Sequence, residues 1–155
     1  MREAPKYILA YLLWAVSIAL GLVAALMVRQ AVSGMFGMAL LNAAPDREFS
    51  LRMQGNAVDR FGVVILGVVL MILIIAAEHL YRTGVQKRKL TRYFFQITAI
   101  ELAVMLVANT LLLSQSLQAG LPASGNLTVE VILLVLLALS VWLYRRQKTR
   151  PLLPV

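Results

Sequence analysis

The chain alternates long apolar runs with short polar segments, and four of the runs are long enough to cross a bilayer. Their pattern predicts helices over about residues 6–29, 60–81, 93–114 and 127–145. An α-helix rises about 1.5 Å per residue, so roughly 20 residues cover a hydrocarbon core about 30 Å thick. We therefore expect an all-α integral membrane protein with four transmembrane helices, forming a single transmembrane domain over residues 1–155.

The first apolar run begins after Pro5 and is uncharged over residues 7–28. A secretory signal peptide also places basic residues before an apolar run. This run is longer than a signal peptide's apolar region, so we interpret it as a spanning helix. Small residues recur in it every fourth position, at Ser17, Gly21 and Ala25. In lipid such a stripe lets another backbone approach closely, which predicts a helix-packing face.

The segment over residues 30–59 is too polar to span and too apolar to lie free in water. Its apolar part is interrupted by Gly34 and Gly37, and Pro45 marks a turn. We expect a short interfacial helix in this first outer loop, or a segment that a partner covers. The charges that follow Pro45 are of both signs, which is typical of a solvated face or of a docking surface.

The overall composition agrees with a membrane protein. Hydrophobic residues make up 61% of the chain and charged residues 14%, with a mean hydropathy of +0.82. The net charge of +8 does not indicate nucleic-acid binding, because the basic residues lie at the ends of apolar segments. The absence of cysteine excludes disulfides, thiol redox chemistry and thiolate metal sites within the chain.

The distribution of basic residues predicts the orientation. With both termini cytoplasmic, eleven Lys and Arg residues fall inside and four fall outside, which follows the positive-inside rule. We expect a bacterial-type inner (plasma) membrane. The loop between the second and third runs is expected to fix the topology and to contact anionic lipid headgroups through five residues: Arg82, Lys87, Arg88, Lys89 and Arg92.

Glu101 is the one charge deep inside an apolar run. It lies about 13 Å along the helix from Arg92, near the middle of the hydrocarbon core. Thr98, Glu101 and Asn109 share one arc of that helix and form a polar intramembrane stripe, which must face protein or water. The stripe indicates either polar contacts to a neighbouring helix, within the chain or in another subunit, or a proton- or ion-handling pathway.

His79 is the only histidine, and it falls in the last turn of the second predicted helix. A single His could ligate a haem or a chlorophyll, but a metal centre needs several ligands. We interpret His79 as an interfacial residue, with cofactor ligation as the alternative, and we expect no metal and no cofactor.

The sequence carries none of the common catalytic signatures, such as G-x-S-x-G, H-E-x-x-H or a phosphate-binding glycine loop. We therefore expect no catalytic residues. The hypothesis that this favours is a non-catalytic accessory or scaffold subunit of a larger membrane complex, with other membrane subunits or further copies of the chain as partners. The alternatives are a small oligomeric channel or transporter that uses Glu101, and a lipid-binding or lipid-modifying membrane protein.

Overall fold

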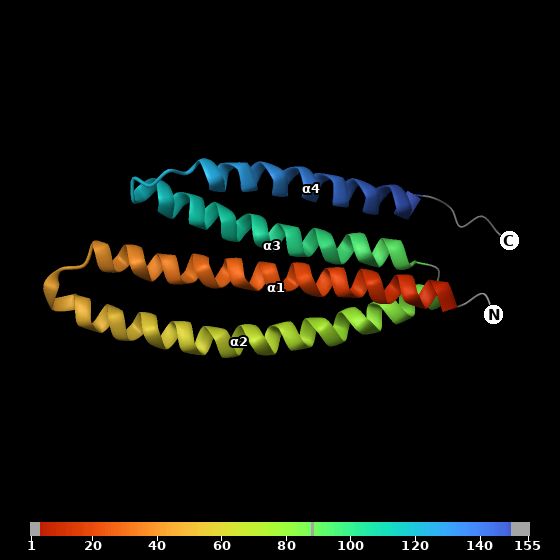
Figure 1. Ribbon diagram of the computed structural model, residues 1–155, viewed down its shortest axis with the longest axis horizontal. Helices are drawn as coiled ribbons and strands as arrows, with labels where there is room; N and C mark the ends of the chain where they lie inside the picture. The colour runs from red at the N-terminus through yellow and green to blue at the C-terminus, as the bar shows by residue number, and fades with distance from the viewer. Residues whose placement is uncertain (1–3, 88, 150–155) are drawn as a thin grey trace.

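The computed structural model describes residues 4–87 and 89–149, and within these residues it consists of four α-helices and no strand. Figure 1 shows them as an elongated antiparallel array: α1 (Ala4–Leu41), α2 (Pro45–Gln86), α3 (Leu90–Gln118) and α4 (Ser124–Thr149). All four are long and apolar enough to cross a membrane. The predicted all-α class with four such helices is confirmed, and it indicates an integral membrane protein.

The helices pack in a row rather than in a square. α1 lies between α2 and α3, and α3 lies between α1 and α4 (Figure 1). α2 also contacts α3, whereas α4 contacts α3 alone among the described helices. The start of α1 and the end of α4 lie at the same end of the array, as an even number of antiparallel helices requires.

The first two helices are much longer than the other two. α1 has 38 residues and α2 has 42, against 29 for α3 and 26 for α4. At about 1.5 Å per residue α1 and α2 extend for about 57 and 63 Å, roughly twice the thickness of the hydrocarbon core.

The structure has no separate short helix between residues 30 and 59, where the sequence pattern predicted one. α1 continues to Leu41 and α2 starts at Pro45, so only residues 42–44 form a turn. Gly34 and Gly37 do not end the helix, because an interior glycine costs only about 1 kcal/mol. Pro45 sets the break instead, since it lies in the first turn of α2, where its missing N–H is not needed.

The connection between α2 and α3 is also shorter than predicted, because α2 reaches Gln86 and α3 already begins at Leu90. Gly84 allows the tight crossing. A Cβ atom there would lie 3.1 Å from the Cα of Leu90 and 3.0 Å from the ring of Tyr93. The backbone N–H of Lys89 donates to the carbonyl of Gly84 at 2.8 Å and closes the turn.

The centre of the array is packed through small residues of α1 that recur every seven positions. Ala10, Ser17, Ala24 and Ala31 are only 5%, 2%, 5% and 1% exposed. Residues seven positions apart differ in direction by only about 20° around a straight helix, so this repeat turns nearly the same face towards the neighbouring helices, and small side chains bring the backbones close. Ala24 joins the hydrophobic core formed with Leu102, Met105 and Leu133.

Candidate functional site

Glu101 faces α1, opposite a glycine. A Cβ atom on Gly21 would lie 3.5 Å from Oε1 of Glu101, so the missing side chain leaves room for the carboxyl group. The other carboxyl oxygen, Oε2, is buried and has no hydrogen-bond partner. An unpartnered buried carboxyl oxygen is costly in an apolar environment and is therefore a candidate for binding something else.

A groove of about 330 Å³ lies beside this carboxyl group, between α1, α2 and α3. Glu101 is the only charged residue among the described residues that line it, and nearly all the others are aliphatic. Five large aliphatic side chains of its walls are exposed, so the groove opens sideways, towards lipid: Val69, Leu73, Leu80, Ile100 and Val104.

The predicted small-residue stripe lies along this groove. Ser17, Gly21 and Ala25 all line it. The hydroxyl of Ser17 is buried and lies 2.7 Å from the hydroxyl of Tyr81, which links α1 to α2. Gly21 and Ala25 contribute almost no side-chain volume, and the groove occupies the space that they leave. Packing of this stripe against a partner helix stays a prediction.

The predicted polar stripe of α3 is divided between two neighbours. Asn109 faces α4, where its side-chain amide donates to Glu130 at 2.6 Å and to the backbone carbonyl of Asn126 at 2.9 Å. Glu101 lies about 80° from Asn109 around the helix axis at 100° per residue, and it faces α1 instead. Thr98 lies between Glu101 and Asn109 around the axis of α3. Its side chain is buried, and its Oγ1 has no hydrogen-bond partner.

The basic residues of the central connection gather at the end of the array where α2 meets α3. Arg82 forms an ion pair with Glu78 at 3.3 Å on α2. The guanidinium of Arg92 lies 5.5 Å from the centre of the Tyr144 ring on α4, a cation–π distance. Lys87 and Lys89 lie in the connection itself, and Arg88 falls outside the described residues. Contact of these residues with lipid headgroups stays a prediction.

His79 is exposed on α2. Within residues 4–87 and 89–149 no three His, Asp or Glu side chains come together as potential metal ligands. Cofactor ligation by His79 stays a hypothesis.

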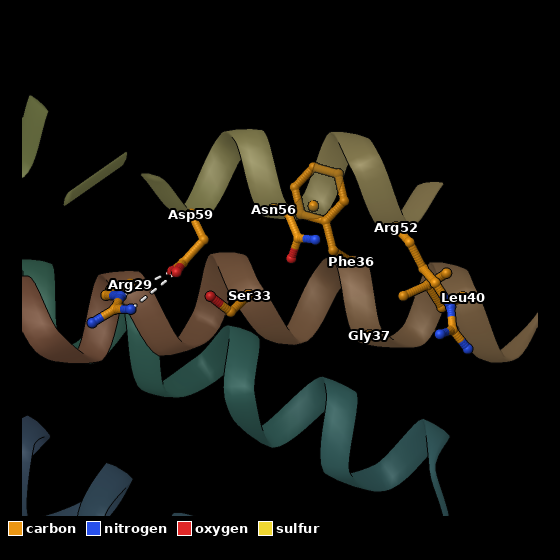
Figure 2. A pocket seen from close by; sticks show the side chains of 9 residues that line it. Arg29, Ser33, Phe36, Gly37, Leu40, Arg52, Asn56 and Asp59 are labelled. Atoms are coloured by element: carbon orange, nitrogen blue, oxygen red, sulfur yellow. Dashed lines mark hydrogen bonds and ion pairs between the residues drawn. The ribbon is translucent and has the colours of Figure 1, made fainter. Parts of the chain in front are cut away.

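A second site, which the sequence did not predict, lies between the extensions of α1 and α2. Figure 2 shows Arg29 of α1 facing Asp59 of α2, and their side chains form two hydrogen bonds of 2.9 and 3.0 Å. The pair lies beside an open cavity of about 600 Å³, which Phe36 and Arg52 also line. The sequence could have indicated this pair. Arg29 and Asp59 each lie fifteen positions from Ala44, so a helical hairpin that turns at Ala44 places them opposite each other.

Comparison of the chain with protein-family models, with curated proteins and with solved structures finds no match. We therefore infer the function from the geometry of the chain itself.

Proposed function

We propose that the chain is a non-catalytic accessory or scaffold subunit of a larger membrane protein complex, and that residues 30–59 form its docking surface, named here the outer hairpin. One observation carries this proposal: α1 and α2 stay paired well beyond the length that crosses a membrane. Residues 30–41 add about 18 Å of helix to α1, and residues 45–59 add about 22 Å to α2. A transmembrane anchor alone needs no such extension.

The surface of the outer hairpin supports a docking role. Phe49 and Met53 are 74% and 60% exposed and lie four residues apart, on one face of α2. Met35 and Leu41 on α1 are also exposed. Large apolar side chains on a segment outside the hydrocarbon core favour burial against another protein, with the surrounding charges as a polar rim.

The outer hairpin is also held in shape before any partner binds. Arg29 and Asp59 bridge its base with paired hydrogen bonds. Phe36 packs against Gly55, where a Cβ atom would lie 3.6 Å from that of Phe36. A preformed surface loses less conformational entropy on binding, which favours a stable complex.

We place the complex in a bacterial-type inner membrane, with both termini cytoplasmic and the outer hairpin on the opposite side. The segment from Arg82 to Arg92 and the segment after Tyr144 together carry nine of the fifteen basic residues, which agrees with the positive-inside rule.

Photo-crosslinking from the outer hairpin tests the docking role. A photoreactive amino acid in place of Phe49 or Met53 is expected to form one defined adduct with another membrane protein in intact membranes. The matched control carries the same amino acid in place of Leu121, which is exposed in the α3–α4 connection outside the outer hairpin, and is expected not to form it. Adducts with lipid alone from both hairpin positions would contradict the proposal.

A second candidate function, a small oligomeric channel or transporter, is favoured by the unpartnered Oε2 of Glu101. A pathway needs further polar groups in line with that carboxyl group, whereas Asn109 is already bonded to α4. Flux measurements in liposomes distinguish the two candidates. If ion or proton flux occurs and Glu101→Gln abolishes it without altering assembly, the scaffold proposal is wrong.

A further inference from the structure

The groove beside Glu101 continues towards the outer hairpin. A second opening of about 450 Å³ lies between α1 and α3 and shares Val28, Ile100 and Val104 with the first. All the described residues that line this second part are apolar, and none belongs to α2. The two parts together follow α1 from Ser17 to Val32, a distance of about 22 Å along the helix.

The groove therefore has one polar point and a long apolar wall. Gly21, which faces the carboxyl group, lies eight residues before Arg29, so Glu101 is about 12 Å deeper than the base of the outer hairpin. At this depth water is scarce, and the carboxyl group needs a partner from protein or ligand. No Lys, Arg or His is among the described residues that line either part of the groove.

From this geometry we propose that the groove binds a lipophilic amine. A rotation of the Glu101 side chain turns its carboxyl group, Oε2 included, towards the ammonium group, and the hydrocarbon part of the amine lies along α1 between α2 and α3. The ion pair satisfies the buried oxygen and neutralises the single charge of the groove. The volume of the first part lies in the range of about 300–1,000 Å³ that is typical of small-molecule sites. This site does not depend on the proposed docking role of the outer hairpin.

Other occupants fit the groove less well. An acyl chain of a phospholipid would fill the apolar wall but leave Oε2 without a partner, and an anionic group would be repelled by the carboxylate. A transmembrane helix of a second subunit would have to bring a hydrogen-bond donor, such as a Ser, Thr or Asn side chain, to the depth of Glu101, and such a neutral donor would leave the negative charge of the groove in place.

The test uses the full chain in phosphatidylcholine nanodiscs and dodecylamine that carries a diazirine in its alkyl chain. After illumination, adducts are mapped by mass spectrometry. We expect saturable labelling of groove residues such as Leu70 and Val104, with little labelling of Ile132 and Val135 on the exposed face of α4. Unlabelled dodecylamine should compete at least tenfold better than dodecanol.

Two pairs of variants separate the carboxyl group from the shape of the groove. Glu101→Gln keeps the size of the side chain and should weaken the competed labelling at least tenfold, whereas Glu78→Gln, which alters a carboxylate outside the groove, should not. Ala25→Leu fills the groove and should also reduce labelling. Ala19→Leu adds the same volume at an exposed position of α1 and should not.

Three results would overturn the inference. Equal competition by dodecanol, or undiminished labelling of Glu101→Gln, would show a site for any apolar chain. Labelling spread evenly over the lipid-facing side chains would show no site. Groove residues that stay unlabelled while lipid-facing side chains of α4 are labelled would show that the groove does not admit the amine. The second and third results are read from the labelling of the unaltered chain, so they can be obtained even if a variant fails to fold.

Discussion

The side-chain amide of Asn109 lies 2.6 Å from a carboxylate oxygen of Glu130, across the interface between α3 and α4. The other carboxylate oxygen of Glu130 accepts a hydrogen bond of 2.6 Å from the hydroxyl of Thr110. Asn126 extends the network, since its side chain donates to Ser116 at 3.0 Å. The end of the α3–α4 pair next to their connection is therefore joined by polar side chains, whereas its middle packs through apolar ones such as Leu102, Met105 and Leu133.

This network predicts a measurable coupling between Asn109 and Glu130. Asn109→Ala should destabilise the protein by about 1 kcal/mol, the usual scale of interhelical hydrogen bonds in membranes. The free energy of unfolding can be measured by detergent titration, with Asn56→Ala as a control at an exposed position of the outer hairpin. In a double-mutant cycle with Glu130→Ala the two effects should not add. Simple additivity would mean that the contact contributes nothing.

A second prediction concerns the crossing of α2 and α3 at Gly84. Gly84→Ala should lower stability by about 1–3 kcal/mol, because the new methyl group meets the backbone of Leu90, which cannot rotate away as a side chain can. Gly67→Ala is the matched control, since a Cβ atom there meets nothing within 4 Å. The unfolding midpoint of the control should be unchanged or higher. A tolerated Gly84→Ala would argue against the tight crossing.

The proposed orientation predicts which introduced cysteines are accessible from outside. The chain has no cysteine, so Ser50→Cys and Lys87→Cys each provide a single labelling site. In intact cells a membrane-impermeant maleimide should label the first variant, in the outer hairpin. It should label the second, in the α2–α3 connection, only after permeabilisation. The reverse pattern would place the outer hairpin in the cytoplasm.

The sequence predicted the spanning part of the fold well. Long uncharged runs such as residues 7–28 must form helices in lipid, because backbone groups there find no other partners. The helix ends were less predictable. Once α1 and α2 leave the hydrocarbon core, their extent depends on contacts between them, such as that of Arg29 with Asp59, and hydropathy carries no information about such pairs.

The candidate site was predictable only in part. The depth of Glu101 follows from its position in the apolar run, but the division of its stripe between α1 and α4 depends on how the helices are arranged in space. The small-residue spacing was ambiguous for a related reason. The sequence pattern favours the small residues at intervals of four, from Ser17 to Ala25, whereas the most buried small residues of α1 recur at intervals of seven, from Ala10 to Ala31.

The most direct test of the proposed role is native mass spectrometry of the chain after gentle extraction from its membrane. The scaffold account predicts a complex of the chain with another membrane protein at a fixed stoichiometry. The double variant Phe49→Ser/Met53→Ser should release that partner while the chain itself stays folded, because both side chains are exposed. Recovery of the unaltered chain alone, as a monomer, would contradict the account.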